Sequence, residues 1–545
     1  MERPPSAKDE QKTTAVQPSW SENALRVWRL RFLDEGETPE DRLRLVAMET
    51  SYKAALKYGL SEEEARRRAE ELYHLMVGKR FMFNSPTIRN AGRDPKLSKA
   101  ACFVIPLGDS MPEIFDAVKT AALIQQAGGG VGADFTPLRP KGDIIASTGG
   151  RSSGPVGFMR IFDAAAEEIK QGGVRRGAWM FSLRANHPDV EEFVSTEFKN
   201  ANTSVSVDDL FMRKVTGENP DPTWELVNPR DGQVWKVVDA REIFRKIVAR
   251  AHATGNPGLL FLDRINADNP LPQLGPITAT NPCGEQPLHP NLACNLGSIN
   301  LGLYWDPVRR KLKWGELFRD ARIATRGLND VIETAHYPTP EIDRAVRASM
   351  QIGLGVMGLA DLLIQAELPY DSPEGRRLAA RCLRVIRWAA RTESRALAEE
   401  RGLFPLWEGS LWGSKGVRVR NAAMTTVAPT GTIGVLVDAS SGIEPLFAVA
   451  YIRKTHEGQE LKYIHPVFVK IAEKEGFYSE ELMQEVARRG TVVGVPGVPE
   501  KWQGIFKGAH DIHWRDHILM QAEVQKNGDN AISKTVYLPH NATEG

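Results

Sequence analysis

The sequence predicts a large α/β protein, either layered or closed into a barrel, behind a small helical N-terminal region. From about residue 100, short apolar runs broken by glycine and proline alternate with longer amphipathic stretches. Short strand-like runs that alternate with helical patterns are typical of α/β folds. These runs are ACFVIPL, GVGADFTPL, AWMFSLRA, TSVSVDDLFM, MTTVAPTGTIGVL and AISKTVYLP. No internal repeat or long linker divides them, so we expect one large body.

Two segments of different composition precede residue 101. Residues 1–19 are polar and rich in Pro, Ser and Lys, which predicts a disordered tail. Residues 20–100 show helical patterns, and one of them begins with Ser61 and Glu64 at capping-box spacing and ends at Gly78. We therefore expect a helical region before the α/β body, which would occupy residues 101–545.

Composition narrows the class of protein. The 545 residues are 42% hydrophobic and 26% charged, as in globular proteins with a sizeable core. Lys plus Arg number 70 against 69 Asp plus Glu, so no overall field favours nucleic acid or a membrane as partner. The N-terminus lacks the apolar core of a signal peptide. We expect a cytoplasmic protein, in which thiols stay reduced unless a disulfide belongs to a working cycle.

Cysteine is rare in this chain. The four cysteines are Cys102, Cys283, Cys294 and Cys382. They form no close C-x2-C pair, which argues against a structural zinc site, and we expect no bound metal. Cys382 shares one helical face with Leu378 and Val385, which favours a small core residue. Cys102 and Cys294 each follow an alanine beside a strand-like run, and a core role is equally open for both.

Cys283 lies in the segment N-P-C-G-E, between Pro282, which fixes the loop, and Gly284, which permits a tight turn. If the loop tip is extended, the alternating Asn281, Cys283 and Glu285 point the same way. A thiolate nucleophile would need an activating histidine, and none is near in sequence. The pattern better suits a thiyl radical, with the carboxylate removing a hydroxyl proton and the amide orienting the substrate. A purely structural turn is the alternative.

One apparent nucleotide fingerprint is rejected. Residues 353–358 spell G-x-G-x-x-G, with Asp371 at a suggestive distance. The preceding segment, EIDRAVRASMQ, predicts a helix where the dinucleotide fingerprint requires a strand. We therefore expect no Rossmann site.

From about Ser21 to its end, the chain resembles the large catalytic subunit of ribonucleotide reductase, and specifically the adenosylcobalamin-dependent class II enzymes. Ordered matches carry this resemblance along the whole length. They are FNSPTIRNAG, ACFVIPLGDS, QQAGGGVGADF, SSGPVGFMRIFDAA, IKQGGVRRGA, TNPCGEQPL, ACNLGSINL, IGLGVMGLADLL, APTGTIG and NAISKTV.

The resemblance implies a ten-stranded α/β barrel with a central finger loop, adenosylcobalamin as cofactor, and reduction of ribonucleotides to 2′-deoxyribonucleotides. Cys283 would be the thiyl radical that abstracts the ribose 3′ hydrogen, and Glu285 would be the base at the 3′ hydroxyl. Asn281 would bind the ribose. Cys102 and Cys294 would supply two electrons and become a disulfide.

The resemblance also implies ligand sites. The loop of APTGTIG would bind the substrate phosphates through Pro429, Thr430, Gly431, Thr432 and Ile433. An ordinary glycine turn is the alternative for this loop. Three further residues would line the substrate site: Thr87, Ala101 and Gly130.

A site for dNTP or ATP effectors, at the interface of a homodimer, would use Asp109, Arg139 and Lys199. The loops 151–157 and 197–202 would complete it. Plain surface ion pairing is the alternative reading of Asp109 and Arg139.

The chain also departs from the family. Its N-terminus does not match a regulatory ATP-cone domain, and its C-terminus stops before the last barrel elements and before the family's C-terminal cysteine pair. We expect either a fragment or a second polypeptide that supplies these parts, with a thioredoxin-like reductant.

Diphosphate and triphosphate substrates both stay open. The alternatives are a glycyl-radical-type reductase, which needs a glycine-radical segment, and a non-catalytic nucleotide-binding regulator, which would not need three such thiols and Glu285.

Overall fold

The computed structural model describes residues 19–171, 175–454 and 460–545. The expected disordered tail therefore lies outside the described residues, except for its last residue, Ser19. Among the described residues no helix is long and apolar enough to cross a membrane.

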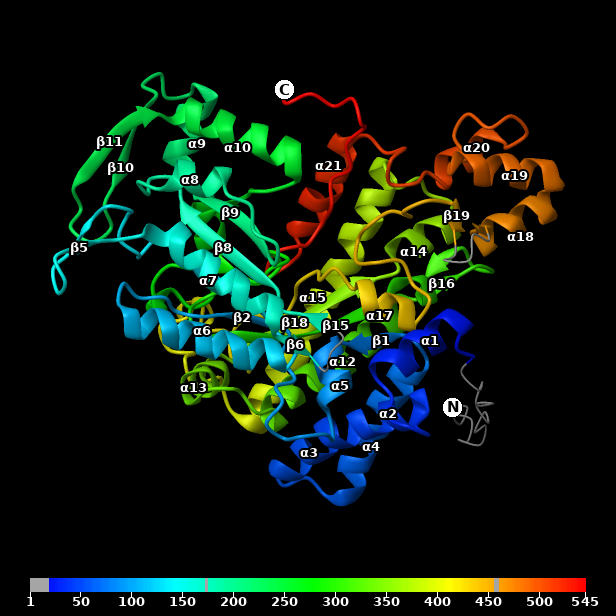
Figure 1. The fold of residues 1–545 in the computed structure, drawn as a ribbon. Helices are drawn as coiled ribbons and strands as arrows, with labels where there is room; N and C mark the ends of the chain where they lie inside the picture. The colour runs from blue at the N-terminus through cyan, green and yellow to red at the C-terminus, as the bar shows by residue number, and fades with distance from the viewer. Residues whose placement is uncertain (1–18, 172–174, 455–459) are drawn as a thin grey trace.

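The N-terminal region is helical and lies at one end of the molecule, in dark blue (Figure 1). Its elements are α1 (Glu22–Arg31), α2 (Pro39–Ala47), a π-helical turn (Met48–Tyr52), α3 (Lys53–Lys57) and α4 (Glu62–Val77). Ser61 caps α4 by accepting from the Glu64 N–H, and Gly78 ends the helix. The reciprocal half of the expected capping box is replaced, because the Glu64 carboxylate pairs with Arg67 and Arg68.

One curled sheet forms the centre of the α/β body. Its strands are β1 (Phe81–Phe83), β2 (Cys102–Val104), β3 (Gly130–Asp134), β8 (Trp179–Arg184), β9 (Ala201–Val207), β12 (Gly258–Phe261), β15 (Ala293–Asn300) and β18 (Ile352–Met357). The order is β1-β15-β2-β3-β8-β9-β12, with β18 on the other side of β15. Strands β2, β3, β8, β9 and β12 are successively parallel, as expected where helices cross over between strands. β15 is antiparallel to β1 and β2 and parallel to β18.

Helices cover the sheet and bury a continuous apolar core. Helices α12 and α15 pack on each other and on β18, and α6 and α7 lie side by side over β3 and β8 (Figure 1). The helices of this part are α5 (Ser85–Asn90), α6 (Met111–Gln126), α7 (Gly154–Glu168), α8 (Val190–Ser195), α9 (Asp209–Thr216), α10 (Ala240–Thr254), α11 (Leu262–Ala267), α12 (Trp314–Thr334), α13 (Pro340–Ser349), α14 (Leu359–Gln365), α15 (Pro373–Arg401), α16 (Leu411–Ser414), α17 (Gly431–Leu436), α18 (Pro466–Glu475), α19 (Glu480–Arg489), α20 (Glu500–Ile505) and α21 (Trp514–Gln525).

A short hairpin, β13 (Ala279–Thr280) and β14 (Pro287–Leu288), crosses the inner face of the sheet. β13 contacts β2, β3 and β8. The approach is so close that a Cβ added to Gly132 would lie 1.7 Å from the Thr280 carbonyl oxygen. On the opposite side, the Thr426 hydroxyl donates to the Glu285 carbonyl oxygen at 2.9 Å. The hairpin therefore lies between two walls of the body, as a central finger.

The expected fold class is confirmed. Two of the expected strand-like runs, however, do not form regular strands. The runs around Thr425 and Ile532 form only isolated bridges, Leu354 with Thr425 and Val427 with Ile532. Pro429, which has no N–H to donate, and Gly431 interrupt the first run soon after it begins to pair.

The G-x-G-x-x-G stretch does not form a nucleotide loop. Helix α13 precedes it, as expected, and its first two glycines lie inside strand β18. A Cβ at Gly353 would lie 2.4 Å from the Leu296 side chain, and one at Gly355 would lie 2.5 Å from the Thr426 carbonyl oxygen. Close packing of the sheet explains both glycines.

Candidate active site

The tip of the finger is a tight turn that presents Cys283. The Gly284 N–H donates to the Asn281 carbonyl oxygen at 3.0 Å, and Gly284 adopts a φ of +79°. The expectation of an extended tip is therefore wrong, because Pro282 and Gly284 both favour a turn. Asn281, Cys283 and Glu285 nevertheless line one cavity.

The side chain of Asn281 connects the finger to the Cys102 thiol. The Gln286 N–H donates to Asn281 Oδ1 at 2.9 Å, which fixes the orientation of the amide. Its Nδ2 then donates to Glu285 Oε2 at 2.8 Å and lies 3.1 Å from Cys102 Sγ. Cys102 Sγ in turn lies 3.7 Å from Glu285 Oε1. A carboxylate, an amide and a thiol thus form one network.

Cys102 and Cys294 lie directly opposite each other on the antiparallel strands β2 and β15. Residues opposite each other in such a pair have Cα atoms about 4.5 to 5.5 Å apart. A disulfide needs Cα atoms about 4.4 to 6.8 Å apart, so the register suits reversible bond formation. Both residues are thiols in this structure.

Exposure separates Cys283 from the other residues of the site. Its side chain is exposed, whereas Cys102 and Cys294 are buried. Asn281 and Glu285 are each only 2% exposed. A reactant outside the protein body can therefore reach Cys283, while the network behind it is shielded from water.

Burial sets the protonation of the network. It raises the pKa of the Glu285 carboxyl, and the hydrogen bond from Asn281 opposes this shift. It also raises the pKa of Cys102 well above the ordinary value, and the charge of Glu285 adds to the effect. The same two causes raise the pKa of Cys294. Both thiols therefore carry their protons at neutral pH, and Cys102 is suited to donate one.

Cys102, Asn281, Cys283 and Glu285 line a cavity of about 290 Å³. Cys294 pairs with Cys102 in the sheet but is not part of the cavity wall. Of the expected substrate residues, seven are on its wall: Ala101, Gly130, Pro429, Thr430, Gly431, Thr432 and Ile433. Thr430 holds a left-handed φ of +55°, which costs energy for a residue other than glycine and is often found at functional sites. Its hydroxyl oxygen accepts from the Gly442 N–H at 2.8 Å, which holds the loop in this conformation.

Thr87 is placed differently from expectation, whereas Gly130 lines the cavity as expected. Thr87 is fully buried, its hydroxyl donates to the Lys99 carbonyl oxygen at 2.9 Å, and it does not line the cavity. A substrate role for Thr87 stays a prediction. A Cβ at Gly130 would lie 2.9 Å from the Pro282 ring, so this glycine makes room for the finger as well as lining the cavity.

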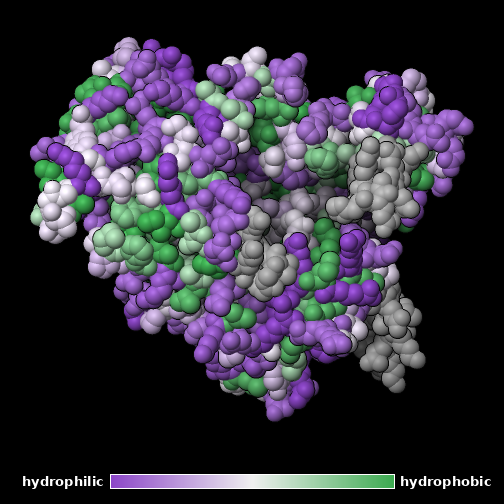
Figure 2. Space-filling model, in the orientation of Figure 1, coloured by the Kyte–Doolittle hydropathy of each residue, from purple (hydrophilic) through white to green (hydrophobic). Residues whose placement is uncertain are grey.

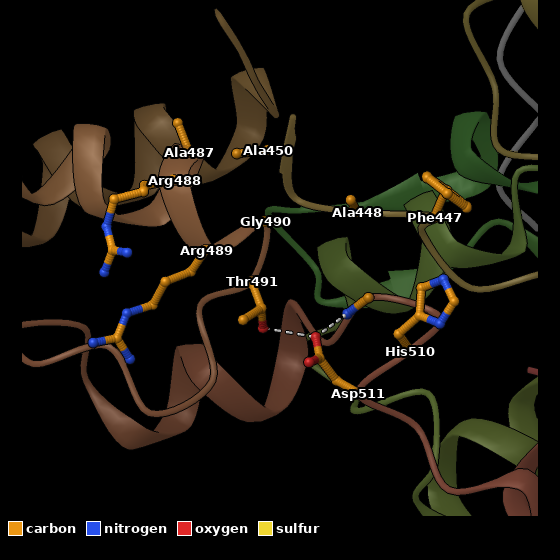
Figure 3. A pocket seen from close by; sticks show the side chains of 11 residues that line it. Phe447, Ala448, Ala450, Ala487, Arg488, Arg489, Gly490, Thr491, His510 and Asp511 are labelled. Carbon is orange, nitrogen blue, oxygen red and sulfur yellow. Dashed lines mark hydrogen bonds between the residues drawn. The ribbon is translucent and has the colours of Figure 1, made fainter. Parts of the chain in front are cut away.

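Another cavity, of about 420 Å³, lies between the segments around Phe447, Arg488 and His510 (Figure 3). The Asp511 carboxylate accepts from the Thr491 hydroxyl at 2.7 Å and from the Gly508 N–H at 2.8 Å. No cysteine lines this cavity. We place the chemistry in the smaller cavity, because the thiols and Glu285 meet there.

Comparison with known proteins agrees with this geometry. The family model "Ribonucleotide reductase, barrel domain" matches residues 100–418 and 414–545, and "Ribonucleotide reductase, all-alpha domain" matches residues 19–95. The chain belongs to the ribonucleotide reductase family.

Curated relatives include two proteins named "Vitamin B12-dependent ribonucleoside-diphosphate reductase". That of Mycobacterium tuberculosis (strain CDC 1551 / Oshkosh) is 45% identical over 95% of this chain and 75% of its own length. That of Thermoplasma acidophilum is 46% identical over 85% of this chain and 60% of its own length. A solved structure, the "Actinobacillus ureae class Id ribonucleotide reductase alpha subunit", has a TM-score of 0.75 at 22% identity, over 94% of this chain and 90% of that one. At that identity the last comparison supports the fold alone.

The residues expected at the effector site of this reductase lie on the surface. Arg139 Nε donates to Asp109 Oδ2 at 2.7 Å, so these two residues do meet, but in an ion pair. Lys199 Nζ pairs with Glu167 on α7 at 2.8 Å. These two ion pairs neither support nor oppose effector binding, which stays a prediction.

Several residues that contact the finger or line its cavity were not predicted for this site from the sequence. Asn202 Nδ2 donates to the Pro282 carbonyl oxygen at 2.7 Å, and the Thr426 hydroxyl holds the Glu285 backbone. Asn84 lines the cavity, whereas the residue expected there from the sequence is Thr87, three positions later. In the sequence, each of these residues is marked by a polar side chain beside a strand-like run. Which of such polar residues face the finger depends on the tertiary fold.

Proposed function

We propose that Cys283, Glu285, Asn281, Cys102 and Cys294 together carry out the reduction of ribonucleotides to 2′-deoxyribonucleotides in this enzyme. One observation carries the proposal: an exposed thiol at the tip of a buried finger lines the same cavity as a carboxyl, an amide and the Cys102 thiol, and Cys294 lies directly opposite Cys102 on the neighbouring strand. A non-catalytic nucleotide-binding regulator would have no use for this convergence.

Each group has a role that fits its environment. A thiyl radical at Cys283 takes the 3′ hydrogen atom, and Glu285 accepts the 3′ hydroxyl proton. The 2′ hydroxyl leaves as water with a proton from Cys102, whose raised pKa keeps it protonated until then. Cys102 and Cys294 supply two electrons and join as a disulfide, and Cys283 returns the hydrogen atom to C3′. The balance is one ribonucleotide and one dithiol converted to one deoxyribonucleotide, one disulfide and one water.

The enzyme depends on adenosylcobalamin, a form of vitamin B12, and its relatives are named as vitamin B12-dependent. The exposure of Cys283 fits this cofactor, because an organic radical source outside the network can reach the sulfur directly. The cavity rim beside Cys283, which includes Ala178 and Pro282, would hold its adenosyl end. When bound, the cofactor supplies the radical that takes a hydrogen atom from a thiol.

Ribonucleoside diphosphates are the favoured substrates, since both relatives are named for them. The loop 429–433 at the cavity wall would bind the phosphates. Effectors of the dNTP or ATP type would bind at Asp109, Arg139 and Lys199.

We also infer a homodimer through α6 and α7. Figure 2 shows apolar surface gathered over these helices, and its exposed side chains include Met111, Phe115, Leu123 and Ile161. Exposed apolar patches of this kind are typical of protein interfaces. An effector site between two copies would then lie next to Lys199, which pairs with Glu167 on α7.

Two further partners are proposed. The chain spans about three quarters of the length of its Mycobacterium relative. One proposed partner is a second polypeptide that carries further barrel elements and a cysteine pair. A thioredoxin-like protein would then reduce that pair, in the cytoplasm that the sequence predicts.

The test is an assay of the chain with a ribonucleoside diphosphate, adenosylcobalamin and dithiothreitol, with and without a polypeptide that carries the remaining elements. We expect a deoxyribonucleoside diphosphate, formed weakly by this chain and strongly in the mixture. The absence of product under both conditions would contradict the proposal. Strong turnover by this chain without the second polypeptide would contradict only the proposed partner.

A further inference from the structure

We propose that the side-chain amide of Asn84 donates a hydrogen bond to a phosphate oxygen of the ribonucleotide, in the cavity that the loop 429–433 also lines. This inference rests on the proposed function and adds a substrate-binding residue to it. Asn84 lies on the cavity wall, just before helix α5.

Three hydrogen bonds fix the position of Asn84. Its N–H donates to the Leu296 carbonyl oxygen at 2.8 Å, and its own carbonyl oxygen accepts from the Ile88 N–H at 3.2 Å. Its side-chain Oδ1 accepts from the Thr87 N–H at 3.2 Å. With Oδ1 committed to the start of α5, the orientation of the amide is set, and Nδ2 is the group left over.

Nδ2 of Asn84 is buried and has no hydrogen-bond partner, and the residue is only 7% exposed. A buried donor without a partner destabilises the folded protein, and native structures leave few of them. An acceptor oxygen on a ligand in the cavity would satisfy this donor. Among the described residues, no protein oxygen accepts a hydrogen bond from Nδ2.

The surroundings of Asn84 indicate which part of the nucleotide supplies the oxygen. Arg31, at the end of α1, donates to the Thr432 hydroxyl at 3.3 Å, and its carbonyl oxygen accepts from Arg89 of α5. Helix α5 and the loop 429–433 are thereby held next to the same residue. Asn84 therefore belongs to the phosphate end of the cavity, while Asn281 and Glu285 hold the ribose end.

The experiment measures binding of ADP and of adenosine to the full chain by equilibrium dialysis. Asn84→Asp keeps the oxygen that caps α5 and replaces the donor by a carboxylate oxygen. We expect its affinity for ADP to fall about tenfold or more, since hydrogen bonds to charged groups are among the stronger ones. Its affinity for adenosine, which has no phosphate, should be unchanged.

Two further variants distinguish loss of this hydrogen bond from a general loss of folded structure. Asn84→Ser also caps a helix well and removes the amide without adding a charge, so we expect a smaller, severalfold loss for ADP. Asn90→Asp is the matched control, because Asn90 is buried on the same helix but its Nδ2 donates to the Ser98 and Ala127 carbonyl oxygens. It should lower the melting temperature without a selective loss of ADP affinity.

Equal losses of ADP and adenosine binding, or no loss of either, in the Asn84 variants would overturn the assignment to phosphate while the proposed function stands. Absence of any ribonucleotide binding by the wild-type chain would overturn the proposed substrate class and this inference with it.

Discussion

The finger site and the effector region are two places where the sequence predicts function, and they differ in how the predicted residues are paired. At the finger, Asn281, Glu285 and Cys102 bond to one another inside a cavity, shielded from water. In the effector region, Asp109 and Arg139 form a partly exposed ion pair, and Lys199 pairs with a residue that was not predicted.

This difference shows that the structure strengthens the sequence prediction at the finger site more than in the effector region. Burying a carboxyl is costly, so a protein that does so without a structural need indicates chemistry. Exposed ion pairs cost little and contribute about 0 to 1 kcal/mol, so their presence carries little information about ligands. The predictions below test this contrast, from the largest expected effect to the smallest.

Cys283→Ser should abolish deoxyribonucleotide formation, because a serine hydroxyl cannot replace a thiol as the carrier of the radical. Ribonucleotide binding should be unchanged, since the side chain is exposed at the tip of the turn. The matched control is Cys382→Ser, which replaces a buried thiol in α15 outside the cavity. It should lower stability and leave turnover largely intact; measurable product from Cys283→Ser would remove Cys283 from its role.

Glu285→Gln should lower turnover about a hundredfold or more, which is the usual size of a lost general base. The amide can still accept from Asn281 but cannot take the 3′ hydroxyl proton. In the wild-type enzyme, turnover should fall as the pH drops through the raised pKa of Glu285, because the base becomes protonated. A pH–rate profile of both proteins checks this, and an acid limb that persists in Glu285→Gln would argue against the assignment.

The same substitution should make the protein more stable at neutral pH. Burial raises the pKa of Glu285 in the folded state above its unfolded value. The folded state therefore binds this proton more tightly, and the stability contributed is present at low pH and lost as the pH rises through the folded pKa. Gln carries no charge, so urea unfolding of Glu285→Gln should show a higher free energy of unfolding at pH 7 and a weaker pH dependence. A lower free energy at pH 7 would show that the carboxylate is stabilising.

Arg139→Ala should change turnover without effectors by no more than about twofold, because an exposed pair contributes little. The response to dNTP effectors should disappear if the predicted site is correct. Arg488→Ala, which breaks an exposed pair with Glu485 at 2.8 Å elsewhere, is the control and should leave the response intact. Equal responses in the wild-type and Arg139→Ala enzymes would move the effector site away from Arg139.

The sequence predicts the fold class through the order of its motifs. The N-P-C-G-E spacing predicts that Asn281, Cys283 and Glu285 lie together, and all three line one cavity. It misjudges the tip of the finger, where Pro282 and Gly284 produce a turn in place of an extended segment. The sequence also selects Thr87, which does not line the cavity, and does not single out Asn84, which does. Which of two nearby polar residues faces a cavity depends on where a short helix starts. Contacts from distant segments, such as those of Asn202 and Thr426, depend on the tertiary fold and have no local signal.

The most direct test of the central claim is a single turnover of the prereduced enzyme, with adenosylcobalamin, a ribonucleoside diphosphate, the second polypeptide if needed, and no external reductant. Mass mapping of the unreduced protein would then follow the state of each cysteine. We predict one Cys102–Cys294 disulfide for each deoxyribonucleotide formed, with Cys283 recovered as a thiol. Product without this disulfide, or a dominant disulfide that includes Cys283, would contradict the account.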